Sequence, residues 1–250
     1  MQRRAFSIHA SGAAAATAAT AYFGSAAMLP VMAQAQGKPP QPGTDYLVLD
    51  KPATPEVAVG KIEVVEFFWY SCQHCNKFEP QLDAWSKTQP ADVVLRRIPV
   101  AFRPDFEPQQ RLYFVLEAMG KVAELHKKVF AAIHVDKEAL NTAEQVANWA
   151  EKQGINKAKF VELYNSFPVA TKARKSTLLQ DTFKVDGVPA LGVAGKYFTS
   201  GSLAQSMERA LLVASYLVDL TRQSSPAKAS SKAPAVPTST TKNAVPAKKP

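Results

Sequence analysis

The spacing of apolar residues changes several times along this chain, and each change predicts a different element. Residues 62–69 (IEVVEFFW) are almost all β-branched or aromatic, which is typical of a central strand buried on both faces. From 75 to 85 the apolar residues recur every three or four positions, which predicts a helix with one buried face. Pro80 lies within that stretch, so we expect the helix to kink there.

Similar patterns extend over most of the remaining chain. Strands are predicted in four further segments, of which the last two form a hairpin: 46–49, 92–101, 188–193 and 196–199. Helical spacing marks four middle segments: 109–119, 122–133, 142–153 and 157–165. One more helix is expected at 168–183. Thr142 and Gln145 have the spacing of a capping box, Gly154 ends that helix, and a long helix is expected at 202–222. This order predicts an α/β protein, a small mixed sheet with a helical insertion.

The first 35 residues have the features of an export signal. Arg3 and Arg4 precede an Ala-rich apolar stretch. Ala-Gln-Ala at 33–35 then provides the small residues that signal peptidase accepts, so we expect cleavage before Gln36. Small and polar residues make the stretch a poor membrane span, although a retained anchor is the alternative. The arginine pair also fits a twin-arginine signal, so the export route stays open.

The two ends of the chain differ from its middle in composition and charge. Residues 36–45 are interpreted as a linker. Residues 223–250 are rich in Ala, Pro, Lys and Ser and have too little apolar surface to fold, so we expect a disordered tail. Of the formal net charge of +9, residues 1–35 carry two positive charges and the tail five. The 23 basic and 21 acidic residues between them nearly balance, which argues against a nucleic-acid partner.

The chain has two cysteines, Cys72 and Cys75, which lie where the predicted central strand gives way to the predicted helix. A helix N-terminus offers unpaired N–H groups and the positive end of its dipole, both of which stabilise a thiolate at Cys72. His74, when protonated, adds a second favourable charge. Because a stabilised thiolate is a good leaving group, the disulfide of this pair is readily passed on to other thiols. We expect Cys72 to react first and Cys75, one turn deeper, to be the resolving thiol.

Other roles for the pair fit the sequence less well. A disulfide that closes so small a ring constrains the unfolded chain very little, so a structural bridge adds little stability. A structural zinc site needs about four ligands, and the chain has no second cysteine pair. Haem attachment requires a histidine directly after the second cysteine, where Asn76 stands. Dithiol–disulfide exchange remains, with no metal or organic cofactor.

Two further features are candidates for the same site. Glu66 interrupts the apolar central strand, where a buried carboxyl would have a raised pKa and could carry the proton of the resolving thiol. The alternative is an exposed position at a sheet edge, as we expect for Glu63. Val188-Pro189 enters the last strand pair, where a trans proline would interrupt the ladder. A cis bond would instead leave the backbone of Val188 free to pair with an extended substrate.

Some polar and aromatic residues of the middle segments receive structural roles. His126 and His134 lie eight residues apart, a spacing more typical of packing than of a ligand site. The aromatic residues nearby are expected to pack the helical block or to line an apolar substrate groove. We assign none of them a part in the chemistry.

Several motifs occur in one order along the chain. They are Glu66-Phe67-Phe68, Cys72-Gln73-His74-Cys75, Phe78-Glu79-Pro80, the stretch 160–167 (FVELYNSF) and the stretch 186–197 around Val188-Pro189. Together they resemble the DsbA family of periplasmic thiol:disulfide interchange proteins over about 46–222. The family has Pro-His between its cysteines, whereas this chain has Gln73-His74. This dipeptide tunes thiolate stability, so Gln73 is a candidate redox-tuning residue.

The resemblance implies a fold and a role for each site residue. The fold is thioredoxin-like, with a mixed sheet from 46–104 and 184–222 and an inserted helical domain at 105–183. The implied roles are Cys72 as nucleophile, Cys75 as resolving thiol, His74 as thiolate stabiliser, Glu66 as buried acid, and Val188–Pro189 as a cis bond that faces the sulfurs and binds substrate.

The resemblance also implies a function and partners. The protein would donate disulfides to reduced exported proteins in the periplasm, as a monomer without cofactor, and a quinone-linked membrane oxidase resembling DsbB would reoxidise it. One alternative is an exported isomerase or reductase, although the linker at 36–45 leaves no room for the dimerisation domain of such proteins. Another is a binding module that presents Cys72, His74 and Cys75 to copper or zinc for delivery.

Overall fold

The computed structural model describes residues 38–224 of the chain. The expected signal peptide at 1–35 and nearly all of the expected tail lie outside the described residues. The final helix, α8 (Met207–Ser224), extends two residues into the segment that we expected to be tail. The side-chain hydroxyl of Ser224, the last residue of α8, donates to the Leu220 carbonyl one turn earlier, at 2.7 Å.

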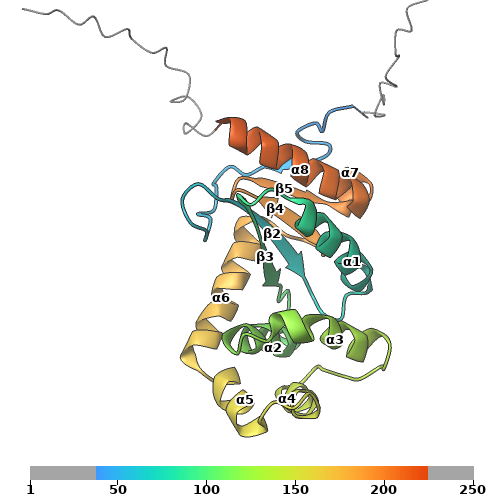
Figure 1. Ribbon diagram of the computed structural model, residues 1–250, viewed down its shortest axis with the longest axis vertical. Coiled ribbons are helices and arrows are strands. Elements are labelled where there is room, and N and C mark those ends of the chain that lie inside the picture. Colours follow the sequence, from blue (N-terminus) through green and yellow to red (C-terminus); the bar gives the residue numbers. More distant parts are fainter. Residues whose placement is uncertain (1–37, 225–250) are drawn as a thin grey trace, which may run out of the picture. The chain divides into compact units, whose positions relative to one another are not determined.

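A five-stranded sheet in the order β1-β5-β4-β2-β3 forms the centre of the fold (Figure 1). The strands are β1 (Leu47–Val48), β2 (Ile62–Phe68), β3 (Val93–Pro99), β4 (Ala190–Val193) and β5 (Tyr197–Ser200). β2 and β3 are parallel, and the other neighbours are antiparallel. The predicted mixed sheet is therefore confirmed.

β2 lies between two neighbours, and all seven of its residues are buried. Successive side chains of a strand point to opposite faces, so both faces of this sheet must be covered. Val64 belongs to the core that includes α8 and α1 (Gln73–Thr88), whereas Val65 and Phe67 belong to the core on the other face. The apolar run seen in the sequence therefore packs on both sides of the sheet, because each face of β2 belongs to a different core.

Helix α1 connects the parallel strands β2 and β3, a connection that needs a crossover. It runs from Gln73 to Thr88 and continues through Pro80, which does not end it. Its buried residues include Cys75, Phe78 and Leu82, as the spacing predicts. The crossover therefore brings the second cysteine into the core directly beside the end of β2.

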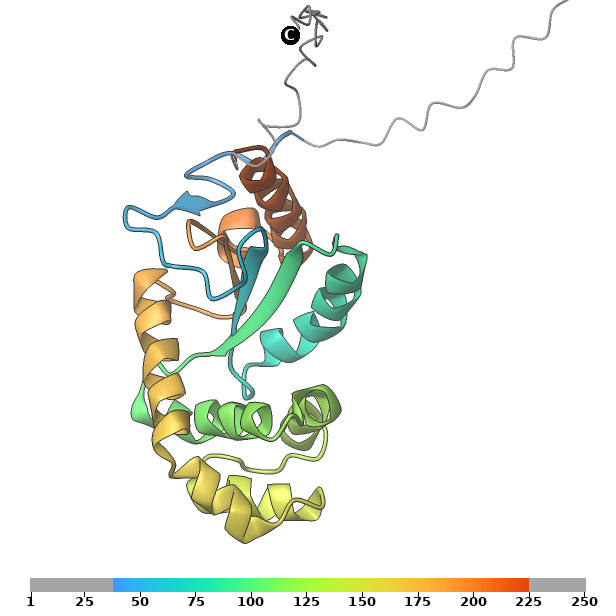
Figure 2. The same cartoon turned by 60° about the vertical axis from the view of Figure 1, so that its left-hand side comes forward.

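The chain between β3 and β4 folds almost entirely into helices (Figures 1 and 2). These are the short η1 (Pro104–Phe106), α2 (Glu107–Ala118), α3 (Val122–His134), α4 (Ala143–Lys152), α5 (Lys157–Tyr164) and α6 (Phe167–Thr182). Thr142 and Gln145 form the predicted capping box at α4. The core of this block also contains Phe68, Tyr70 and Cys75, so the helices pack against the end of β2 and the start of α1. The exact division between sheet and insertion stays a prediction.

The hairpin β4–β5 turns through two residues with positive φ, Ala194 at 53° and Gly195 at 66°. A Cβ on Gly195 would come within 2.0 Å of the Ala53 carbonyl oxygen. The Ala53 N–H in turn donates to the Gly195 carbonyl at 2.7 Å. Glycine is required here because the chain before β2 crosses the turn in direct contact with its backbone.

Two expectations are corrected by the structure. The single helix expected at 202–222 is two helices, α7 (Gly201–Ala204) and α8, because Gln205 adopts φ of 70° and Ser206 accepts the Arg209 N–H at the start of α8. Glu63, expected to be exposed at an edge, is 2% exposed. It lies on the inner strand β2 and accepts a hydrogen bond from Arg96 of β3 at 2.7 Å, so its charge is paired.

Candidate active site

Cys72 is the N-cap residue of α1, directly after the loop that leaves β2. Its N–H donates to the Trp69 carbonyl at 3.0 Å, and its sulfur accepts the N–H of Cys75 at 3.3 Å. The sulfur therefore lies at the positive end of the helix dipole, with a backbone donor aimed at it. Both cysteines are free thiols, so the structure describes the reduced pair.

The two sulfurs have opposite electrostatic environments. The hydrogen bond with Cys75, backbone N–H groups of Cys75 and His74, and the charge of His74 together lower the pKa of Cys72 to about 6, although burial opposes them. Burial and the neighbouring Cys72 raise the pKa of the Cys75 thiol well above its usual value. At neutral pH the pair therefore holds one thiolate, on the more accessible sulfur, and one thiol.

The peptide bond between Val188 and Pro189 is cis, as the resemblance implies. Cys72 Sγ lies 3.4 Å from the Val188 carbonyl oxygen, although 116 positions separate the two residues. A hollow of about 440 Å³ lies beside this contact. Its lining includes His74, Val188, Pro189, Gly201, Gln205 and Met207. The first sulfur thus contacts the cis-proline loop, and this loop and His74 border an open space.

His74 and Gln73 are exposed in the first turn of α1. His74 lines the hollow, and its charge is the smallest of the influences that lower the pKa of Cys72. Gln73 is the first residue of α1, and the N–H groups that stabilise the Cys72 thiolate belong to the two residues after it. The tuning role expected for Gln73 stays a prediction.

Glu66 is completely buried in β2, opposite Arg97 of β3. Burial and the charge of Glu79 raise the pKa of Glu66 well above its ordinary value, and they outweigh Arg97, whose Nε lies 3.1 Å from Oε2. Neither carboxyl oxygen makes a hydrogen bond with the described residues, so the contact with Arg97 is a close charge pair without hydrogen-bond geometry. The charge of Glu66 also helps to raise the pKa of the Cys75 thiol.

Arg97 gathers three carboxyl groups, and we call this group of four side chains the Arg97 cluster: Glu66, Glu79, Asp83 and Arg97. Arg97 Nη2 lies 3.0 Å from Glu79 Oε2 and 2.8 Å from Asp83 Oδ1. Lys127 of α3 pairs with Asp83 at the rim of the cluster. Of these four residues, only Glu66 was predicted from the sequence to belong to the site.

His126 and Tyr70 extend the Arg97 cluster into the helical block. His126 Nε2 is 3.0 Å from Glu79 Oε1, and its Nδ1 is 2.8 Å from the Tyr70 hydroxyl. His134 donates from Nε2 to the Tyr70 carbonyl oxygen at 2.8 Å. We expected only packing from the two histidines, and the structure shows that they also make these polar contacts. Their spacing in the sequence gave no signal of a shared partner.

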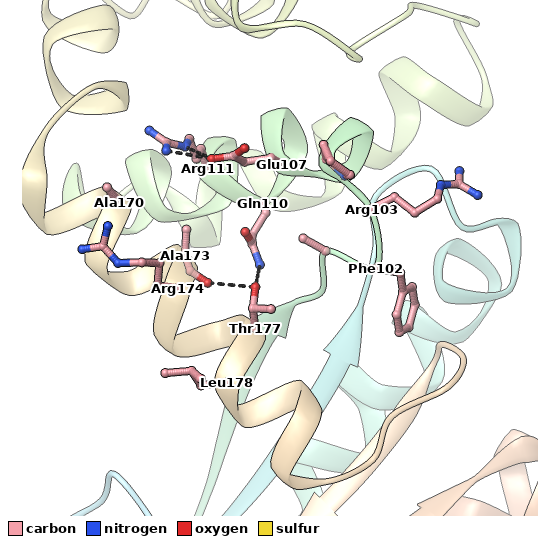
Figure 3. Close-up of a pocket in the computed structure, with 12 residues that line it drawn as sticks. Phe102, Arg103, Glu107, Gln110, Arg111, Ala170, Ala173, Arg174, Thr177 and Leu178 are labelled. Carbon is pink, nitrogen blue, oxygen red and sulfur yellow. Dashed lines mark hydrogen bonds and ion pairs between the residues drawn. The ribbon is translucent and has the colours of Figure 1, made fainter.

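A separate hollow of about 620 Å³ lies between α2, α6 and the loop after β3 (Figure 3). Ala101, Phe102, Ala170, Ala173 and Leu178 give it apolar walls, and Arg103, Arg111 and Arg174 also line it. Arg111 pairs with Glu107 at 2.7 Å, and Gln110 donates to Thr177 at 3.4 Å. None of the predicted site residues lines this hollow, so it is distinct from the redox pair.

Among residues 38–224, no helix combines the length and the apolar character needed to cross a bilayer. In the same residues, no three side chains of His, Cys, Asp or Glu come together as a possible metal site.

The fold and the site define a thioredoxin-like dithiol–disulfide oxidoreductase, with a Cys-x-x-Cys pair at the start of the helix that follows a central strand. Comparison with known proteins gives the family. Residues 63–212 match the family model described as a DSBA-like thioredoxin domain. The chain belongs to this DsbA-like family.

Individual relatives agree with this assignment. The chain is 38% identical over 187 residues to the thiol:disulfide interchange protein DsbA of Burkholderia cepacia, which covers 75% of this chain and 88% of the relative. It is 41% identical over 192 residues to the DsbA of Bordetella pertussis, covering 77% and 86%. The crystal structure of Pseudomonas aeruginosa DsbA superposes with a TM-score of 0.68 at 38% identity, over 72% of this chain and 94% of that one.

Proposed function

We propose that this protein donates disulfide bonds to reduced exported proteins through Cys72 and Cys75. The observation that carries the proposal is the unequal environment of the two sulfurs, an N-cap thiolate beside a buried thiol. Stabilisation of the Cys72 thiolate favours the reduced pair over its disulfide, so the oxidised enzyme readily gives its disulfide away. Membership of the DsbA-like family supports the same direction.

The exchange takes two steps. A substrate thiolate attacks Cys72 Sγ, the Cys72–Cys75 bond breaks, and the bonding electron pair leaves on Cys75. A second thiolate of the substrate then attacks the substrate sulfur of the mixed disulfide and expels Cys72 as a thiolate. Two substrate thiols are oxidised to one disulfide, and the enzyme disulfide is reduced to the pair that the structure describes.

Glu66 supplies the proton of the first step in this proposal. The leaving sulfur of Cys75 is buried, and burial raises the pKa of its thiol, so the departing thiolate needs a proton at once. The raised pKa of Glu66 keeps the nearby carboxyl protonated until then. After the transfer Cys75 is a thiol and Glu66 a carboxylate, which regains its proton from solvent.

Substrate binds in this proposal along the cis-proline loop. The contact between Cys72 Sγ and the Val188 carbonyl shows that this loop borders the reactive sulfur. An extended peptide could pair with the backbone of Val188 while its cysteine reaches Cys72. The hollow lined by His74 and Met207 offers space for the neighbouring side chains of the peptide.

We further propose the setting in which the cycle closes. The export signal predicted at 1–35 fits a periplasmic protein, and in that compartment a quinone-linked membrane oxidase resembling DsbB would reoxidise the reduced pair. The enzyme would act as a monomer, since the exchange chemistry needs only the two cysteines of one chain.

The pH dependence of Cys72 alkylation tests the proposed function. We expect the rate of reaction of the reduced protein with iodoacetamide to rise through a midpoint near pH 6, because only the thiolate reacts. A Cys75→Ser variant isolates the first sulfur, and Cys72→Ser should abolish oxidation of a reduced protein substrate. A midpoint near pH 9, or substrate oxidation by Cys72→Ser, would contradict the proposal.

A further inference from the structure

His126 of α3 is a buried polar residue that the proposed exchange leaves without a part. The residue is 4% exposed, and its ring lies among four aromatic rings, those of Phe68, Tyr70, Tyr113 and Phe130. Both of its ring nitrogens are nevertheless paired, Nδ1 with Tyr70 and Nε2 with Glu79. An apolar ring would fill this place equally well, so packing does not account for an imidazole.

The two partners determine which ring nitrogen carries hydrogen. The Glu79 carboxylate can only accept, so Nε2 carries hydrogen and donates to it. Within residues 38–224 the buried Tyr70 hydroxyl has Nδ1 as its hydrogen-bond partner, so in a neutral imidazole with hydrogen on Nε2 the hydroxyl donates to Nδ1. The neutral Nε2–H tautomer therefore satisfies every polar atom of this chain of contacts.

Glu79 connects this imidazole to the Arg97 cluster. Burial alone would raise the pKa of Glu79, but the hydrogen bond from His126, the charge of His126 when protonated, and the contacts with Arg97 outweigh burial and lower it. Glu79 is thus ionised, and its charge is second only to burial among the causes that raise the pKa of Glu66. A contact made by the helical block therefore affects the acid beside Cys75.

A charge count gives the same result. Glu79 and Asp83 each bring one negative charge, and Arg97 and Lys127 each bring one positive charge. With a neutral His126, the group is neutral only while Glu66 holds a proton. That exchangeable proton can reside on Glu66 or on Glu79, and Glu66 is the carboxyl whose charge raises the pKa of the Cys75 thiol.

We propose that His126 is a positioning residue for the proton step at Cys75, because its Nε2–H holds Glu79 in the ionised form and so keeps the exchangeable proton on Glu66. This inference rests on the proposed function, in which Glu66 protonates the leaving sulfur. The other titratable groups that face Glu66 and Glu79 are Asp83 on α1, Arg97 on β3, Tyr70 in the loop before α1, and Tyr113 on α2.

His126→Phe removes the donor to Glu79 and keeps an aromatic ring among the surrounding rings. Loss of one charge-assisted hydrogen bond is expected to raise the pKa of Glu79 and to move part of the proton away from Glu66. The rate at which a small thiolate reduces the oxidised protein should then fall about tenfold at pH 7, with a changed pH profile. Carboxyl ¹³C NMR of Glu66 and Glu79, assigned with Gln variants, follows the proton directly.

His126→Gln and His134→Phe are the matched variants. Glutamine can place its amide nitrogen near the position of Nε2, so His126→Gln should restore the titration of Glu79 and the rate. His134→Phe loses a contact with the same Tyr70 but none with a carboxylate, and its pH profile should match that of the parent protein. A His126→Phe protein with the parental titration and profile, altered only in melting temperature, would overturn the proposal.

Two further readouts keep the inference testable on its own. Imidazole ¹⁵N NMR of the unaltered protein should show Nε2–H and an unprotonated Nδ1 for His126, and the opposite tautomer would overturn the proposal even if His126→Phe does not fold. The carboxyl titrations do not require activity. A protein that fails to oxidise any substrate would therefore contradict the proposed function, while a parental titration in His126→Phe contradicts only this inference.

Discussion

Cys72 and Cys75 differ in pKa although one helical turn separates them. The first sulfur caps α1 and accepts backbone N–H groups, whereas the second is carried by the same turn into the core. Sequence reasoning could anticipate this difference, because the strand-to-helix boundary is visible in the apolar pattern. It could anticipate the buried acid Glu66 for the same reason, as a charged residue within an apolar run.

The remaining residues of the Arg97 cluster could not be assigned from the sequence. Glu79 and Arg97 come from different elements, and only the parallel register of β2 and β3 brings Arg97 opposite Glu66. A partial signal existed, since Glu63 and Glu66 in one strand are matched by Arg96 and Arg97 in the next. Without the register, that signal does not say which charges meet.

Replacement of Glu66 by Gln should make the protein more stable and the enzyme slower. Folding raises the pKa of Glu66. The contribution of this carboxyl to the free energy of unfolding is therefore fully present below its unfolded pKa of 4.5, and it is lost as the pH rises toward its folded pKa. Glutamine does not titrate, so we expect a gain of about 1–2 kcal/mol in the free energy of unfolding at pH 7. Urea unfolding at pH 4 and pH 7 measures this gain, which should vanish at the lower pH.

The activity of the same variant tests the proton step. Without an acid beside Cys75, the rate of substrate oxidation should fall by at least about tenfold at pH 7. Asp105→Asn is a suitable control, because Asp105 is an exposed carboxylate paired only with Arg103 among the described contacts. An undiminished rate in Glu66→Gln would remove Glu66 from the mechanism.

Replacement of Gln73 by Pro tests the expected tuning role of Gln73 against the backbone donors of α1, which by themselves would leave the ionisation of Cys72 nearly unchanged. Gln73 is the first residue of α1, where proline is tolerated because its N–H has no partner within the helix. The N–H groups that lower the pKa of Cys72 belong to His74 and Cys75. The alkylation midpoint should therefore stay near pH 6, and a shift of a full unit would show that Gln73 does tune the thiolate.

At the scale of elements, the helices of the insertion were predicted well because several have an amphipathic pattern, most clearly α3 and α4, and one has a recognisable cap. Thr142 with Gln145 is this cap, and both of its hydrogen bonds are present. The break between α7 and α8 was missed, because Gln205 is a residue that rarely adopts positive φ and gives no sequence signal of a turn.

The hairpin β4–β5 provides a prediction at this scale. Gly195→Ala should lower the free energy of unfolding by about 2 kcal/mol or more, because Cβ would collide with the Ala53 carbonyl and alanine disfavours φ of 66°. Chemical unfolding measures the loss. Gly187→Ala is the control, since no atom lies within 4 Å of its added Cβ and its φ is not positive. Equal stabilities of the two variants would contradict the contact between this turn and the chain before β2.

At the scale of the whole molecule, the redox state of the pair and the stability of the fold are coupled. The pKa of Cys72 is lowered from 9.0 to about 6 by folding, so the stability that its thiolate provides is fully present above pH 9 and is lost as the pH falls through 6. The disulfide form has no such titration. The reduced protein should therefore gain stability relative to the oxidised protein as the pH rises.

Thermal unfolding of both redox forms between pH 5 and pH 8 measures this coupling. We expect the thiolate to favour the reduced form by about 1 kcal/mol at pH 7, after allowance for the partial exposure of Cys72 to solvent. Cys72→Ala cannot form the disulfide, and its stability should follow the pH dependence of the oxidised rather than the reduced parent protein. If the difference in melting temperature between the two redox forms stays constant over this pH range, the Cys72 thiolate is not stabilised by folding.

The contact of Cys72 with Val188 joins positions that are 116 residues apart, with the whole helical insertion between them. A ribosome releases the cysteines long before it releases the loop that faces them. A growing chain therefore carries both cysteines before it has the loop along which we propose that substrate binds. Because Val188 lies about three quarters of the way along the 250 residues, the pair can meet a client at that loop only after most of the chain has been made.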